Sequence, residues 1–231
     1  ILNITKKGIN TVIPRTSYSN IELNNRKELG KKLFLEKNWH EKKEKLIVIG
    51  TSTGGPRALQ HVLTKLPKEI NAAILIVQHM PPNFTKSLAN RLNTLSSIIV
   101  KEAADGELIQ KGVAYIAPGG FHLKVKPIGK KIAVQLEQSK PVNGHRPSVD
   151  VMFHSVSLLH HYAKIAVIMT GMGSDGTNGL LELANSDKIK AIAESKETSI
   201  VFGMPKAAIA TKCIDEIQNV ENIAETIMKY V

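Results

Sequence analysis

Three short segments of the sequence place chemically capable side chains directly after apolar runs. The first is Gly50-Thr51-Ser52-Thr53-Gly54-Gly55, between a buried-strand pattern and a helix pattern. Its serine is expected at the carboxyl end of a strand, where open α/β sheets bind ligands. The spacing fits G-x-S-x-G, a pattern typical of a nucleophilic serine on a tight strand-to-helix turn. Unpaired N–H groups at the start of the next helix would suit a developing oxyanion.

The same segment is compatible with two other interpretations. A glycine-rich loop that leads into a helix can bind a phosphate or another anion. This loop lacks the lysine of a P-loop and the G-x-G-x-x-G spacing of dinucleotide-binding loops. A purely structural turn is the third interpretation, and the segment alone does not decide among the three.

Two further segments supply partners for the serine. His79 lies in Gln78-His79-Met80-Pro81-Pro82, and Asp175 in Thr170-Gly171-Met172-Gly173-Ser174-Asp175-Gly176, each just beyond an apolar run. Adjacent strands lie about 5 Å apart, so His79 is expected to reach Ser52 as general base and Asp175 to orient His79. Taken alone, a strand-end histidine is more often structural, and Asp175 more often an N-cap of the following helix. Together the three predict a Ser52–His79–Asp175 triad of a serine hydrolase that acts on carboxylic esters.

Alternating strand and helix patterns must position these residues. Apolar runs predict buried strands, and 3.6-residue periodicity predicts helices between them. This alternation indicates an α/β fold with a doubly wound, mainly parallel sheet in a single catalytic domain. The middle of the chain, where turns separate short apolar runs, predicts a small antiparallel portion at one edge. The predicted strands are 46–49, 73–77, 164–170 and 189–193, the short candidates 98–100, 113–117, 121–125 and 132–136, and the helices 56–66, 83–95, 148–160, 176–184, 205–210 and 220–230.

Composition and charge restrict the class of protein. The net charge is +11, and residues 1–45 hold 11 Lys or Arg against 5 Asp or Glu, a net of +6. Residues 1–44 show no sustained periodicity and are interpreted as a linker or partly ordered N-terminal arm, with the catalytic domain at 45–231. The basic arm lacks interleaved aromatic residues and any nucleic-acid fold signature, so we expect no nucleic-acid partner. No apolar run is long enough for membrane insertion, and no signal peptide is visible. Cys213 is the only cysteine, which fits a reducing compartment and predicts a cytoplasmic protein.

Five segments together resemble a known family, and they occur in the family's order from about Leu46 to the C-terminus. The resemblance is to the catalytic domain of CheB-type chemotaxis protein-glutamate methylesterases. The segments are Ile47-Val48-Ile49-Gly50-Thr51-Ser52-Thr53-Gly54-Gly55-Pro56, Val77-Gln78-His79-Met80, His145-Arg146-Pro147-Ser148-Val149-Asp150, Thr170-Gly171-Met172-Gly173-Ser174-Asp175-Gly176 and Val201-Phe202-Gly203-Met204-Pro205.

The resemblance implies an activity and a set of roles. The substrate would be a γ-glutamyl methyl ester on the cytoplasmic helices of a bacterial chemoreceptor, and many members also deamidate receptor glutamines. Ser52 would be the nucleophile, His79 the base and Asp175 its orienting partner. The backbone N–H of Met172 would bind the oxyanion, with Thr53 beside it. No metal and no organic cofactor is implied, and the family usually carries an N-terminal receiver domain, which is not visible in this sequence.

Other expectations from the same comparison are less specific. Arg146 would meet acidic groups that flank the ester, although a surface arginine before a helix fits the sequence equally well. The chain departs from the family at residues 185–187, where a Gly-Gly turn is common, and at Glu194, where glutamine is common. Two other functions stay open at this stage. They are a small-molecule serine esterase and a non-enzymatic, anion-binding α/β regulatory module.

Overall fold

The computed structural model describes Trp39, residues 44–186 and residues 189–231, and the described residues from Glu44 onward belong to one compact unit. Apart from Trp39 and Glu44, the predicted arm over residues 1–44 lies outside the described residues, and so does Asp187. Among the described residues, no helix has the length and apolar character needed to cross a bilayer.

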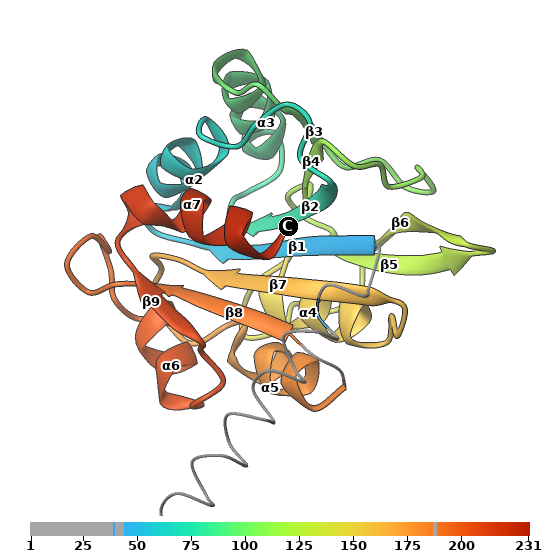
Figure 1. Ribbon diagram of the computed structural model, residues 1–231. Helices are drawn as coiled ribbons and strands as arrows, with labels where there is room; N and C mark the ends of the chain where they lie inside the picture. Colours follow the sequence, from blue (N-terminus) through green and yellow to red (C-terminus); the bar gives the residue numbers. More distant parts are fainter. Residues whose placement is uncertain (1–38, 40–43, 187–188) are drawn as a thin grey trace, which may run out of the picture. The chain divides into compact units, whose positions relative to one another are not determined.

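A seven-stranded parallel sheet forms the centre of this unit (Figure 1). Its two innermost apolar runs are almost completely buried, which explains their lack of alternation, because helices cover both faces of a parallel sheet. The strand order is β3-β4-β2-β1-β7-β8-β9, and every neighbouring pair is parallel. The strands are β1 (Glu44–Thr51), β2 (Ala72–Gln78), β3 (Ile99–Glu102), β4 (Val113–Ile116), β7 (Tyr162–Ile168), β8 (Ile189–Glu194) and β9 (Glu216–Gln218).

Helices cover both faces of the sheet, which confirms the predicted doubly wound architecture. One face carries α2 (Gly55–Leu63), α3 (Phe84–Leu95) and α7 (Val220–Tyr230), and Figure 1 shows the others on the opposite face. These are α4 (Val149–Ser157), α5 (Thr177–Ser186) and α6 (Met204–Ala210). Because all main strands run in one direction, their carboxyl ends and the loops that follow them meet along one edge.

The antiparallel portion is smaller than the sequence predicts. β5 (His122–Ile128) and β6 (Lys131–Glu137) form the expected antiparallel hairpin, which packs on α4. The expectation that 98–100 and 113–117 also pair in antiparallel fashion is wrong, since β3 and β4 are parallel members of the main sheet. Their connection contains no helix and runs along the hairpin instead. There the N–H of Ile109 donates to the Ile132 carbonyl, and that of Val134 to the Glu107 carbonyl, both at 2.9 Å.

Candidate functional site

The backbone of Ser52 is fixed at the carboxyl end of β1. Its N–H donates to the Thr170 carbonyl at 3.0 Å, which links the loop after β1 to the loop after β7. Gly171 permits this approach, because a Cβ at that position would lie 2.7 Å from the Ser52 Cβ. The turn then enters α2 through Gly54, whose φ of 84° lies in the left-handed region that glycine tolerates. The serine hydroxyl is therefore held at the strand end where the sequence predicts it.

His79 follows β2 directly and is tied to the Ser52 loop by Gln78. The Gln78 amide nitrogen donates to the carbonyls of Ser52 (2.9 Å) and His79 (3.0 Å). Its amide oxygen accepts the Thr51 hydroxyl at 2.7 Å, and the side chain is 2% exposed. Sequence reasoning gave Gln78 no role, because a polar residue at the end of an apolar run has no distinctive signal. The structure makes it the bridge between the two loops.

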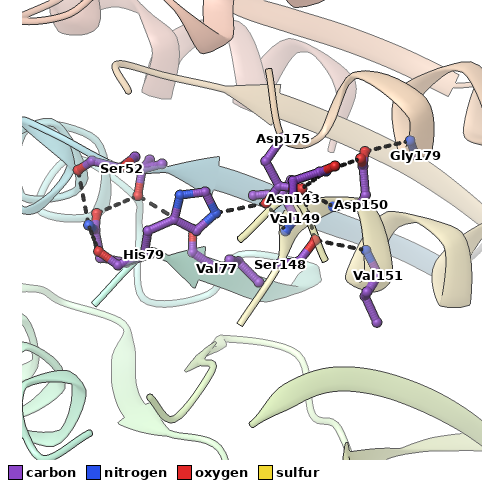
Figure 2. A network of polar contacts seen from close by, with 12 residues as sticks. Ser52, Val77, His79, Asn143, Ser148, Val149, Asp150, Val151, Asp175 and Gly179 are labelled. Carbon is purple, nitrogen blue, oxygen red and sulfur yellow. Dashed lines mark hydrogen bonds and ion pairs between the residues drawn. The ribbon is translucent and has the colours of Figure 1, made fainter. Parts of the chain in front are cut away.

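His79 and Asp175 form a buried pair, as predicted. The His79 Nε2 lies 2.7 Å from the Asp175 Oδ2, and the two side chains are 6% and 1% exposed. Figure 2 shows His79 between Ser52 and Asp175. An ionised carboxylate only accepts, so Nε2 carries a proton, and in the neutral ring Nδ1 then has a lone pair. Within the described residues this buried Nδ1 has no hydrogen-bond partner. It is therefore the atom available to a serine proton, and such contacts often tighten only when substrate binds.

The Asp175 carboxylate is docked at the N-terminus of α4 (Figure 2). It accepts hydrogen bonds from the Val149 N–H (2.6 Å), the Ser148 hydroxyl (2.8 Å) and the Asn143 amide (2.9 Å). Burial alone would raise the pKa of Asp175, but these bonds and the one from His79 outweigh it and lower the pKa from 3.8 to about 2. Ser148 also accepts from the Val151 N–H as the N-cap of α4. Asp175 thus serves α4 and His79 rather than capping the helix that begins at Thr177.

A second histidine lies flat against His79. The rings of His145 and His79 are stacked, with centroids 3.7 Å apart and planes 8° from parallel. Burial and the nearby His79 lower the pKa of His145, despite an opposing effect of Asp175. His145 has no role of its own in the sequence analysis, because no local pattern brings the loop before α4 to the sheet edge. The stack fixes the plane of the His79 ring.

An open cleft of about 370 Å³ lies over these groups. Among the described residues, the Met172 N–H donates no hydrogen bond, and neither does the Thr53 N–H, whereas the Ser52 N–H is occupied by Thr170. The oxyanion role of Met172 and Thr53 stays a prediction, since neither residue is among those that line the cleft. The cleft is lined by Ser52, His79, Met80, Pro81, Gly144, His145, Arg146 and Pro147.

Arg146 lines the cleft but is also used structurally. Its Nη1 donates to the carbonyls of Ser139 (2.8 Å) and Gln138 (3.4 Å), which are in its own loop. The expected meeting with acidic groups of a substrate stays a prediction.

Within the described residues, no group of three or more His, Cys, Asp or Glu side chains is arranged to hold a metal ion. Taken together, these groups could perform serine-based acyl transfer.

Comparisons with known proteins identify the family of this chain. The family model for CheB methylesterase matches residues 47–227. A protein-glutamate methylesterase/protein-glutamine glutaminase of Halalkalibacterium halodurans is 61% identical over 80% of this chain and 53% of that protein. The Bacillus subtilis protein of the same description is 53% identical over 80% of this chain and 52% of its own length. The chain thus spans about half the length of these relatives. The crystal structure of the Thermotoga maritima CheB methylesterase catalytic domain matches with a TM-score of 0.79 and 45% identity, over 81% of this chain and 99% of that one.

Proposed function

Because the chain belongs to the CheB methylesterase family, we propose that it hydrolyses glutamate γ-methyl esters on the cytoplasmic helices of bacterial chemoreceptors and releases methanol. The observation that carries the proposal is the buried His79–Asp175 pair beside Ser52 in one open cleft. The names of the relatives support this substrate class. A receptor substrate of this kind requires the cytoplasm as the site of action.

The first half of the reaction acylates the serine. The Ser52 Oγ attacks the ester carbonyl carbon while its proton passes to the His79 Nδ1. The Asp175 carboxylate stabilises the resulting imidazolium through Nε2. The N–H groups of Met172 and Thr53 donate to the oxyanion of the tetrahedral intermediate. The bond from carbon to the methoxy oxygen then breaks, and methanol leaves with the proton from His79.

The second half releases the product by the same steps. A water molecule gives a proton to the His79 Nδ1 and attacks the acyl carbon. The Ser52 oxygen leaves with that proton, and glutamate is freed. Receptor glutamine would react at the same site, with ammonia in place of methanol, and the relatives' full description supports this second activity. No metal or organic cofactor takes part in either sequence of steps.

A receiver domain in front of the catalytic domain is part of the same proposal. The relatives are about twice as long as the region they share with this chain, which supports a receiver domain in front of the catalytic domain. Residues 1–44 would then be the linker between the two.

Arg146 would meet acidic groups that flank the ester on the receptor helix, because a guanidinium pairs well with carboxylates.

The test is methanol release from the methylated cytoplasmic domain of a chemoreceptor. Ser52→Ala should lower kcat by about a thousandfold or more, because the nucleophile is removed while binding remains. Release at the wild-type rate by this variant would refute the assignment of Ser52. Rapid turnover of aryl esters without any release from receptor would favour a small-molecule esterase. Phosphate bound at Gly54 and Gly55, without any hydrolysis, would favour the anion-binding module.

A further inference from the structure

Glu194 is a buried carboxylic acid that the reaction scheme does not use. It ends β8, and its side chain is 1% exposed. Burial raises the pKa of this carboxyl group, although hydrogen bonds from Thr170 and Thr198 act in the opposite direction. A carboxyl group is costly to bury unless its oxygens are hydrogen-bonded, so its contacts should explain its position.

Both oxygens of Glu194 bind groups from other elements. Oε2 accepts the backbone N–H of Thr170 at 2.8 Å, and Oε1 accepts the Thr198 hydroxyl at 3.0 Å. The Thr198 oxygen in turn accepts the N–H of Val220, the first residue of α7, at 3.0 Å. The carboxyl group therefore connects the N-terminus of α7 with the loop that follows β7.

Thr170 is the residue that carries this connection to the cleft. It lies beyond the end of β7, so its N–H depends on Glu194 rather than on the sheet. Its carbonyl accepts the Ser52 N–H at 3.0 Å, and its hydroxyl donates to the Thr53 carbonyl at 2.9 Å. Gly171 and Met172 follow it directly. One residue thus fixes the backbone of the serine and begins the segment with the N–H assigned to the oxyanion.

The surroundings of Glu194 separate it from the reaction cleft. A second cavity, of about 250 Å³, lies beside Gly54 on the side of α2 and α7. Four charged or titratable side chains line it with Glu194: Arg57 and His61 of α2, Glu197, and Glu221 of α7. Glu221 raises the pKa of Glu194 and His61 lowers it, after the larger effect of burial. Glu194 is not among the residues that line the reaction cleft, so we expect its effect on the reaction to pass through Thr170.

We propose that Glu194 is a positioning residue for the serine nucleophile, which acts by holding the Thr170 N–H and, through Thr170, the backbone of Ser52 and the Met172 segment. This inference rests on the proposed function. It predicts that a hydrogen-bond acceptor is needed at position 194 and that the negative charge is not. Glutamine meets this need, because its amide oxygen can accept from Thr170 while its amide nitrogen donates to Thr198.

The experiment compares Glu194→Ala and Glu194→Gln with wild type in the 231-residue chain. The first readout is the rate at which a fluorophosphonate probe labels Ser52, which requires an activated serine but no receptor. The second is kcat and KM for methanol release from methylated receptor. Asp215→Ala is the matched control, because the Asp215 carboxylate also accepts a backbone N–H of β8, from Ala191 at 2.8 Å, but does not contact the serine loop.

In Glu194→Ala, the probe should label Ser52 at least about tenfold more slowly than in wild type, because a small misplacement of reacting groups is costly. The kcat should fall by a similar factor, and the KM should stay within about threefold of the wild-type value. Glu194→Gln should stay within about threefold of wild type, and Asp215→Ala should label at the wild-type rate even if urea unfolds it more easily. If Glu194→Ala does not fold, Thr198→Val takes its place and should label severalfold more slowly.

The outcomes separate this inference from the proposed function. Wild-type labelling of Ser52 by Glu194→Ala, or by Thr198→Val in its place, overturns the positioning role alone. A Glu194→Gln variant as slow as Glu194→Ala overturns the claim that an acceptor suffices. A wild-type chain that the probe does not label overturns the proposed function and this inference with it.

Discussion

The Asp175 carboxylate is the group whose replacement tests the site most directly. In Asp175→Asn, one oxygen becomes an NH₂ group that must face N–H donors. On the Oδ2 side, that group would meet the Val149 N–H and the His79 Nε2. His79 could then pair only as the other tautomer, with its proton on Nδ1 and no lone pair for the serine. On the Oδ1 side, the amide would meet the Asn143 amide nitrogen instead.

The magnitude follows from the pKa of Asp175. A carboxyl pKa lowered from 3.8 to about 2 corresponds to about 2 kcal/mol of stability at neutral pH. Loss of the charge should lower the free energy of unfolding by about that amount, out of a typical 5–15 kcal/mol, so the variant should still fold. The wrong tautomer should lower kcat by about a thousandfold or more. This stability is present above the unfolded pKa of 3.8 and is lost only as pH falls through about 2.

Urea unfolding and methanol release measure the two effects. The unfolding free energy of Asp175→Asn should be lower than that of wild type by about 2 kcal/mol at about pH 7, which lies above both the folded and the unfolded pKa of the Asp175 carboxyl. Asp150→Asn is the control. This neighbouring carboxyl is 8% exposed, and burial raises its pKa, so it is not a charge that stabilises the fold. Its oxygens accept from the Gly179 N–H and the Asn143 amide, so the new amide group also faces N–H donors, and the variant measures the loss of an acceptor without the loss of a stabilising charge. Wild-type kcat in Asp175→Asn would refute the orienting role, and a loss of stability in Asp150→Asn as large as that in Asp175→Asn would refute the electrostatic reasoning.

Two further predictions concern contacts around the same groups. His145→Ala removes the ring stacked on His79 and should lower kcat severalfold. His145→Phe should retain most of the wild-type kcat, because an aromatic face remains. Equal kcat values in the two variants would exclude the stack as a positioning contact. Gly55→Ala would place a Cβ 1.9 Å from the Gln78 amide oxygen and should cost about 1–3 kcal/mol in urea unfolding together with most of the activity. Gly129→Ala, where a Cβ meets nothing within 4 Å but φ is 60°, measures the cost of backbone strain alone, and a loss in Gly55→Ala no larger than this would contradict the steric argument.

The central strands and the positions of the site residues could be read from the sequence because both depend on local patterns. Buried apolar runs identify β1 and β2, and the polar residue after each run must emerge at the sheet edge. The order of the strands in the sheet and the contacts between loops cannot be predicted from local patterns, because they depend on segments that are distant in the sequence. β3 and β4 were misread because the hairpin replaces a crossover helix. β9 was missed because its three residues include no fully buried side chain.

The groups that complete the site come from a segment without a local signal. Asn143, His145 and Ser148 belong to the loop and cap before α4, and only the fold brings them to Asp175 and His79. Ser148 is the N-cap of α4, but its second hydrogen bond, to Asp175, is not predictable from capping alone. Local sequence patterns therefore identify the site residues that follow strands, but not those that belong to the loop and cap before α4.

The position of Asp175 explains why the pair works with its histidine neutral. A carboxylate that relied on His79⁺ for its charge would tend to take up a proton whenever the ring lost its own. Asp175 instead receives the Val149 N–H at the positive end of α4, together with the Ser148 hydroxyl and the Asn143 amide. These donors are present whatever the charge of the ring, so the carboxylate stays ionised when, in the proposed reaction, the neutral ring accepts the serine proton. The stabilisation of the imidazolium is then already in place when the proton arrives, as electrostatic preorganisation requires.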